Sequence, residues 1–380
     1  MVTLVRVLKI TCCLSFLSLC LQSGVLAWGQ QPVSAAHVGG IAPSEKPQAH
    51  DSAQVPHFEF DRPPERVTFR NGDVQLTGVL VKPEGVGPFP AVIFVHGSGP
   101  ATHDEPAFVV HANTFLRQGF AVLSYDKRGS GESTGNLEMS DYDDLAHDVS
   151  SAVSYLRTRS EIAPSKIGLL GRSEGGWVGT LAASRDPQIS FVVMSSGCAI
   201  GPYEETLYWT RTALRAKGVP DSRIEEAVKL KADIWIFYRN VAEGKIAHSA
   251  QRSDLASLRQ RFSQFADLHP ELPPSIMDPD IEDPRKFSAF THMMYYDPAP
   301  ALSAVHAPLL EAIGANDEAV EPSSTLAVLE HLRASGHDVT ARTFPGVGHA
   351  LLIMDGTRIL GYADGYLDYV VQWAKDQVKR

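Results

Sequence analysis

Short runs of apolar residues recur along most of the chain, separated by segments with the hydrophobic period of a helix. The first four runs are AVIFVHG, FAVLSYD, KIGLLG and FVVMSSG, between residues 91 and 197. Such runs are typical of strands that are buried on both faces of a sheet. The same alternation resumes with PLLEAIG and DVTARTFPG after residue 307. The pattern predicts an α/β fold, with a mostly parallel sheet that helices cover on both faces.

Helices are predicted in three of the intervening segments. Residues 141–159 carry apolar side chains on one helical face, GGWVGTLAAS follows the run KIGLLG, and Tyr366–Val378 closes the pattern. Ahead of the first apolar run, RVTFRNGDVQLTGVLV alternates polar and apolar residues around Asn71-Gly72. An Asn-Gly pair between two alternating segments predicts a β-hairpin.

Residues 201–300 interrupt the alternation of strands and helices. This segment has a helical period and several aromatic residues, and LHPELPPSIMDPDIEDP breaks it with prolines. We expect a helical cap, residues 201–300, inserted into an α/β domain made of residues 61–200 and 301–380. The aromatic residues of the cap, with MMYY at 293–296, suit either an apolar pocket or plain core packing.

The N-terminal residues 1–27 have the pattern of a secretory signal peptide. Arg6 and Lys9 precede an almost uncharged apolar stretch that ends in VLA. An uncleaved membrane anchor is the alternative. Residues 28–60 lack periodicity and are rich in Gln, Ala, Ser and Pro, which predicts a disordered leader. We therefore expect a secreted or periplasmic protein with no stable membrane insertion once the signal is removed.

Three of the four cysteines lie within the predicted signal peptide. Only Cys198 would remain in the mature chain, so that chain can form no internal disulfide. Cys198 directly follows the apolar run FVVMSSG. This position favours a buried structural thiol over a nucleophile.

The composition is that of an ordinary globular chain and narrows the range of partners. The 380 residues are 44% hydrophobic and 21% charged, with a formal net charge of −10 and a pI near 5.8. Such a chain lacks the strongly basic face that nucleic acids require, so we expect no nucleic-acid partner. Its histidines and carboxylates show no metal-ligand spacing, and we predict neither a metal nor a cofactor. The oligomeric state stays open.

The stretch KIGLLGRSEGGW places Ser173 between glycines directly after a predicted buried strand. Gly-x-Ser-x-Gly between a strand and a helix is typical of a nucleophile elbow, a tight turn that lifts the serine hydroxyl above the sheet. Gly171 and Gly175 suit such a turn because larger side chains would collide in it. An ordinary glycine-rich turn is the alternative.

A serine nucleophile needs a base, and the base needs a group that orients it. His349 follows the last predicted strand in FPGVGH and is the candidate base. Asp317 follows the strand PLLEAIG in GAND and is the candidate orienting acid, with the adjacent Glu318 as its rival. The chain order Ser, Asp, His is the order found in α/β-hydrolases.

Two backbone N–H groups are candidates for an oxyanion hole. One belongs to Glu174, directly after the candidate nucleophile, and the other to Ser98 in the loop HGSGP. The Ser98 hydroxyl lacks the strand–turn–helix setting of a nucleophile.

The motif DKRGSGES, residues 126–133, lacks the Gly-Lys-Ser/Thr ending of a phosphate-binding loop. We interpret it as structural support, in which Asp126 and Arg128 hold the loop.

The motifs HGSGP, DKRGSGES, GRSEGG, GAND and GVGH, in this order, resemble those of the α/β-hydrolase superfamily. Over residues 64–378 the chain resembles secreted bacterial serine esterases of the EstD-like kind, related to dienelactone hydrolase and prolyl-oligopeptidase catalytic domains. The resemblance implies a carboxylesterase that cleaves a small-molecule ester through Ser173, Asp317 and His349. Arg172 is a departure, since relatives often carry His at this position.

Other functions are compatible with the same residues. A peptidase or aminopeptidase, a thioesterase and an acyltransferase would each use this triad, and a catalytically silent binding protein could share the scaffold. Dehalogenase and epoxide hydrolase chemistry would both need a carboxylate at position 173. The fold by itself does not specify the substrate.

Overall fold

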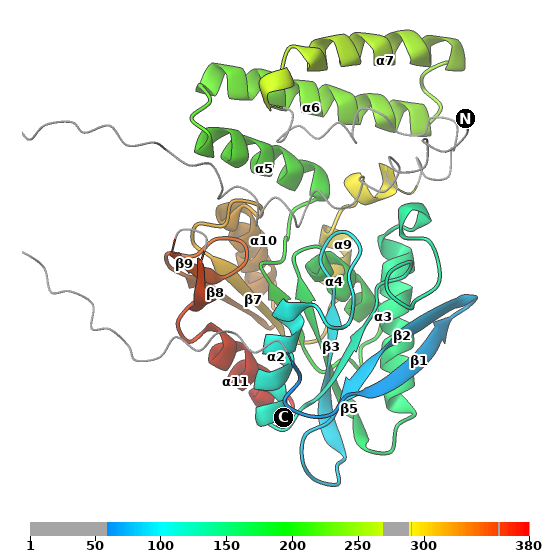
Figure 1. Cartoon of the computed structure of the whole chain (residues 1–380), viewed down its shortest axis with the longest axis vertical. Helices are drawn as coiled ribbons and strands as arrows, with labels where there is room; N and C mark the ends of the chain where they lie inside the picture. The colour runs from blue at the N-terminus through cyan, green and yellow to red at the C-terminus, as the bar shows by residue number, and fades with distance from the viewer. Residues whose placement is uncertain (1–58, 269–288, 290, 356–357, 380) are drawn as a thin grey trace, which may run out of the picture.

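The computed structural model describes residues 59–268, 289, 291–355 and 358–379 (Figure 1). The predicted signal peptide and all but the end of the predicted leader lie outside these residues, as does the proline-rich part of the cap. The secreted or periplasmic location therefore stays a prediction. No helix within the described ranges is long and apolar enough to cross a membrane.

A single eight-stranded sheet forms the centre of the molecule, with the strand order β1-β2-β4-β3-β5-β6-β7-β8. Its strands are β1 (Glu65–Asn71), β2 (Val74–Val81), β3 (Phe89–Val95), β4 (Ala121–Tyr125), β5 (Ile162–Arg172), β6 (Val192–Ser195), β7 (Leu309–Gly314) and β8 (Val339–Phe344). The strands from β4 to β8 run parallel, whereas β2 is antiparallel to both β1 and β4. The six segments predicted as strands form β3 to β8, which confirms the predicted fold class.

Two details of the sheet follow from local chemistry. The predicted hairpin joins β1 to β2, and Gly72 occupies the left-handed region with φ 55°. β8 lies at the edge of the sheet, and its residues 341–343 are exposed. Edge strands meet solvent along one side, so this strand differs from the fully buried strands in the centre.

Helices cover both faces of the sheet because successive strand residues point to opposite sides. In β3, Val92 and Phe94 face one core, and Ile93 and Val95 face the other. The first core is closed by α2 (Pro106–Arg117) and α11 (Tyr366–Gln377). The second is closed by α3 (Tyr142–Arg157), α4 (Gly175–Arg185), α9 (Ala299–Ala304) and α10 (Pro322–Ala334). Figure 1 shows this three-layer arrangement.

Three further helices stand above the carboxyl ends of the parallel strands (Figure 1). They are α5 (Pro202–Ala216), α6 (Asp221–Ala242) and α7 (His248–Ser263), and the short 3₁₀ helix η2 (Ala266–Leu268) follows them. Trp235, Phe237 and Tyr238 are buried in a hydrophobic core of their own, which these helices form. The helical insertion therefore has an independent core above the sheet.

The methionines and tyrosines at 293–296 pack as core residues. Met293 and Tyr296 pack against the core beneath α3 and α4, whereas Met294 and Tyr295 pack against the core of the cap helices. This segment thus joins the cap to the central domain.

A second sheet was not predicted: β9 (Leu352–Asp355) and β10 (Arg358–Tyr362) form a short antiparallel pair shortly after His349. The 3₁₀ helix η1 (Leu137–Met139) was not predicted either.

Candidate active site

Ser173 lies on a sharp turn between β5 and α4. Its φ of 53° falls in the left-handed region, which residues other than glycine rarely adopt. The turn also brings backbone atoms very close together. A Cβ added at Gly171 would lie 2.0 Å from the Gly175 carbonyl oxygen, and one at Gly175 would lie 2.2 Å from that of Val95. The two glycines are therefore required by contact, and the turn has the geometry of a nucleophile elbow.

The structure brings Ser173, His349 and Asp317 together from three distant parts of the chain. His349 Nε2 lies 3.0 Å from Ser173 Oγ. On the other side of the ring, His349 Nδ1 lies 3.0 Å from Asp317 Oδ2. Nδ1–H can donate only to the carboxylate, so Nε2 is left to accept the serine proton. The three side chains form a continuous hydrogen-bond chain.

The carboxylate of Asp317 is fixed by its surroundings. The residue is buried, and its Oδ1 accepts hydrogen bonds from the backbone N–H groups of Ala319 (2.9 Å) and Val320 (2.8 Å). The cap also contacts this loop, because the Tyr208 hydroxyl on α5 donates to the Asp317 carbonyl oxygen at 2.9 Å. The acid therefore has a defined position before any substrate binds.

Glu318, the rival to Asp317, has a different partner. Its Oε2 accepts a hydrogen bond from the backbone N–H of His349 at 3.1 Å. A Cβ at Gly348 would lie 2.3 Å from the same oxygen, so glycine at this position leaves room for the contact. Glu318 therefore holds the loop that carries the imidazole, while Asp317 contacts the imidazole itself.

The loop after β3 lies against the elbow. A Cβ added at Gly97 would be 3.5 Å from the Ser173 Cβ. The backbone N–H groups of Ser98 and Glu174, predicted as oxyanion donors, have no hydrogen-bond acceptor among the described residues. Backbone N–H groups without a protein acceptor can receive a developing oxyanion.

A cluster of charged residues lies beside the elbow, around the carboxylate of Glu105. Arg172 donates to Glu105 at the start of α2 over 3.0 Å, and His96 Nδ1 lies 3.4 Å from the second oxygen of that carboxylate. Burial acts to raise the pKa of Glu105, but His96 and Arg172 outweigh it and hold the pKa below its ordinary value. The departure at Arg172 thus has a structural partner directly before α2.

The motif at residues 126–133 supports the neighbouring loops. Asp126 accepts hydrogen bonds from the backbone N–H groups of His103 and Glu132, each at 2.8 Å. Arg128 forms a buried two-point ion pair with Asp148 on α3. Both residues hold the loop as predicted. Lys127 was not predicted as a site residue, and its ammonium contacts the loop after β3 and the Glu174 side chain.

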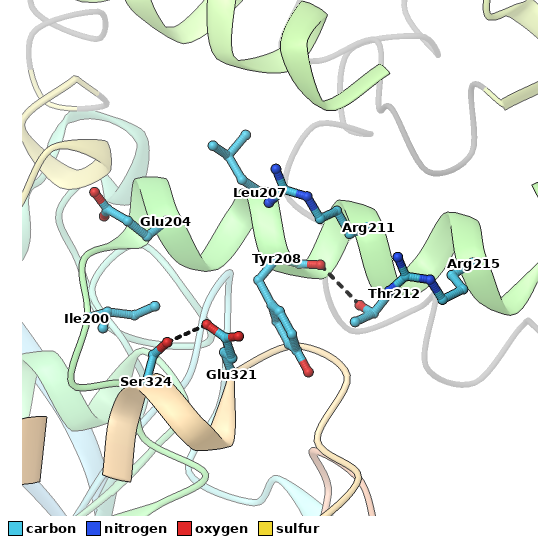
Figure 2. Close-up of a pocket in the computed structure, with 9 residues that line it drawn as sticks. All are labelled: Ile200, Glu204, Leu207, Tyr208, Arg211, Thr212, Arg215, Glu321 and Ser324. Carbon is cyan, nitrogen blue, oxygen red and sulfur yellow. Dashed lines mark hydrogen bonds between the residues drawn. The ribbon is translucent and has the colours of Figure 1, made fainter. Parts of the chain in front are cut away.

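A cavity of about 450 Å³ lies between α5 and the start of α10 (Figure 2). Arg211, Arg215 and Tyr208 extend along one wall, and Glu321 and Ser324 form part of the other. No triad side chain lines it, although Tyr208 connects its wall to the Asp317 loop.

Within the described ranges, no group of three or more His, Cys, Asp and Glu is placed to hold a metal ion. Cys198 is buried, as predicted, and burial raises the pKa of its thiol.

A central sheet between two layers of helices, with a strand–serine–helix elbow, defines a serine hydrolase of the esterase-type α/β-hydrolase class. Residues 71–353 match the model of the family described as X-Pro dipeptidyl-peptidase (S15 family), and the chain belongs to this family.

The chain is also similar in sequence or in fold to several known proteins. Esterase EstD from Thermotoga maritima is 29% identical over 171 residues, which cover 43% of this chain and 40% of EstD. Acyl-coenzyme A thioesterase 3 from Mus musculus is 28% identical over 204 residues, covering 51% of this chain and 43% of the thioesterase. The chain thus spans less than half the length of these two relatives. A solved structure of DcsB with a substrate analogue shares the fold, with a TM-score of 0.53, 18% identity and coverage of 84% of this chain and 100% of that one.

Proposed function

We propose that this enzyme hydrolyses carboxylic esters through an acyl-enzyme on Ser173. The observation that carries the proposal is the hydrogen-bond chain from Ser173 Oγ to His349 Nε2 and from His349 Nδ1 to Asp317. A neutral imidazole oriented in this way can take the serine proton as the hydroxyl attacks an ester carbonyl. The buried carboxylate then stabilises the imidazolium that forms.

Each step moves a proton through His349. Attack of Ser173 Oγ on the carbonyl carbon gives a tetrahedral intermediate whose oxyanion the Ser98 and Glu174 N–H groups receive. Collapse of this intermediate breaks the C–O bond to the alcohol, and His349 Nε2–H protonates the leaving oxygen. Water then enters, and His349 accepts its proton as the hydroxide adds to the acyl-enzyme. A second collapse releases the carboxylic acid and restores the serine hydroxyl.

p-Nitrophenyl esters and a fluorophosphonate probe test this proposal directly. The native protein is expected to show a burst of p-nitrophenol equal to the enzyme concentration and to become labelled by the probe at Ser173. The Ser173→Ala variant should lose the burst, steady turnover and label while remaining folded. Turnover that persists in this variant would disprove the assignment, and an unlabelled, inactive native protein would favour a silent binding protein.

A second candidate is cleavage of peptides or thioesters by the same residues. The matching family is described as X-Pro dipeptidyl-peptidase, and the Mus musculus relative is an acyl-coenzyme A thioesterase. A panel in which one acyl group is presented as an ester, a coenzyme A thioester and an anilide, beside Xaa-Pro anilides, separates these candidates by kcat/KM. We expect the ester to be preferred. A higher kcat/KM for Xaa-Pro anilides would assign the enzyme as a peptidase.

A further inference from the structure

We propose that Lys127 is the positioning residue of the oxyanion hole, because its ammonium holds the groups that carry both N–H donors. This inference rests on the proposed function, which assigns the Ser98 and Glu174 N–H groups as those donors. The buried Lys127 side chain makes two contacts, and each contact acts on a different donor.

The first contact orients the Ser98 donor. Lys127 Nζ donates a hydrogen bond to the Gly97 carbonyl oxygen at 2.9 Å. That carbonyl and the Ser98 N–H belong to one peptide group, and in a trans peptide the two bonds point in opposite directions. Binding the carbonyl on the Lys127 side therefore directs the Ser98 N–H to the other side. A free carbonyl would allow this glycine-rich loop to rotate the donor away.

The second contact fixes the Glu174 donor. Lys127 Nζ also donates to Glu174 Oε1 at 2.5 Å. Glu174 precedes the first residue of α4, and its own backbone N–H is the second donor. One ammonium therefore connects two segments that are 77 positions apart in the sequence. The distance between the two donors depends on this connection.

The surroundings of Lys127 make the connection rigid. Lys127 and Glu174 are each 5% exposed, so solvent offers little competition for their hydrogen bonds. The Lys127 backbone N–H donates to the Ala101 carbonyl oxygen at 3.0 Å, so the loop after β3 is held at two points. An ammonium on a carbonyl also polarises the peptide group, which makes the Ser98 N–H a stronger donor.

A purely structural ion pair is the competing explanation, and the next residue in the chain offers a matched control. Arg128 is also 5% exposed, and its partner Asp148 is 1% exposed. The Arg128 guanidinium bonds Asp148, Ser140 and the Asp144 carbonyl, and contacts neither Gly97 nor Glu174. Loss of either cation leaves a buried carboxylate without its partner, but only Lys127 contacts the donor segments.

The experiment compares Lys127→Met with Arg128→Met in the full chain, at equal concentrations of folded protein. Complete loss of one oxyanion donor costs about 10²–10³ in kcat, so a misdirected donor is expected to lower kcat about 10- to 100-fold. KM should change little, because the oxyanion forms only after binding. The inhibition constant of an alkyl boronic acid, which forms a tetrahedral adduct, should rise by a similar factor. Arg128→Met should affect both quantities much less than Lys127→Met, because the Arg128 guanidinium contacts neither donor segment.

Two further variants keep the test decisive. Lys127→Arg retains a cationic donor and should recover part of the loss. If Lys127→Met does not fold, the double variant K127M/E174Q removes both charges and carries the same comparison. Equal boronic acid affinity in the native and Lys127 variants would overturn the inference while the proposed function stands. Failure of both Met-containing variants to fold would assign the pair a structural role and overturn it as well. A native protein without turnover or probe labelling would overturn both proposals.

Discussion

The carboxylate of Glu318 binds the backbone N–H of His349 at 3.1 Å, on the same loop whose imidazole is bound by the neighbouring Asp317. Two adjacent acids therefore hold one histidine in two ways. Asp317 sets the ring tautomer and carries charge opposite the imidazolium, whereas Glu318 holds only the main chain.

This division predicts unequal effects of removing the two charges. Asp317→Asn should lower kcat by about 10³–10⁴, because an amide can stabilise the wrong tautomer and offers no charge to the imidazolium. Glu318→Gln should lower kcat by less than about tenfold, since a neutral oxygen can still accept the backbone hydrogen bond. Steady-state kinetics with one p-nitrophenyl ester measure both variants. Equal losses would mean that Asp317 does not orient the base.

The proposed role of Ser98 depends on its backbone N–H and not on its hydroxyl. The proposed mechanism uses only the backbone N–H of Ser98, so Ser98→Ala should leave kcat and fluorophosphonate labelling close to those of the native enzyme. Ser173→Ala, tested beside it, should abolish both. Loss of labelling in Ser98→Ala, with Ser173→Ala still labelled, would identify Ser98 as the nucleophile and contradict the elbow assignment.

Two glycines near the elbow should respond to alanine in opposite directions. A Cβ at Gly171 would lie 2.0 Å from a backbone oxygen, whereas a Cβ at Gly179, within α4, would meet nothing within 4 Å. Gly171→Ala is expected to destabilise the fold by about 1–3 kcal/mol or more, because the added methyl group overpacks the turn. Gly179→Ala should stabilise it by about 0.5–1 kcal/mol through helix propensity. Urea unfolding measures both, and a tolerated Gly171→Ala would contradict the contact geometry.

A buried histidine on α2 should make stability depend on acid. His111 Nδ1 donates to the Ala107 carbonyl at 2.6 Å, so Nε2 accepts from the Tyr366 hydroxyl at 2.9 Å. Burial lowers the pKa of His111 to about 4, although the Ala107 carbonyl opposes the shift. Between pH 6.5 and 4 the unfolded chain binds a proton that the folded chain does not. This group therefore contributes stability above pH 6.5 that is lost as the pH falls through that window.

The His111→Gln variant tests this contribution. Its free energy of unfolding should fall less steeply than that of the native protein between pH 6.5 and 4, by up to about 1.4 kcal/mol for each pH unit. Denaturant titrations at several pH values give the slopes. Identical slopes for the native and His111→Gln proteins would show that His111 is protonated in the folded state.

Much of the fold was readable from the sequence because central parallel strands are buried on both faces. Each of β3 to β7 contains a short, mostly apolar run, and Ser173, Asp317 and His349 follow the ends of β5, β7 and β8. The β9–β10 pair gave no such signal, because it is short, partly exposed and follows the histidine loop. The roles of Glu318 and Lys127 were also missed, since each acts through a backbone group that no sequence pattern marks.

The sequence by itself determined the sheet, the elbow and the chemical identity of the reacting side chains. Those features depend on local apolar runs and on glycines that are needed within a few residues of Ser173. Only the tertiary structure decided which acid meets the imidazole, and that one lysine joins Gly97 to Glu174. Such contacts depend on how loops from distant strands meet at one end of the sheet, and their hydrogen-bond directions exist only once the chain has folded.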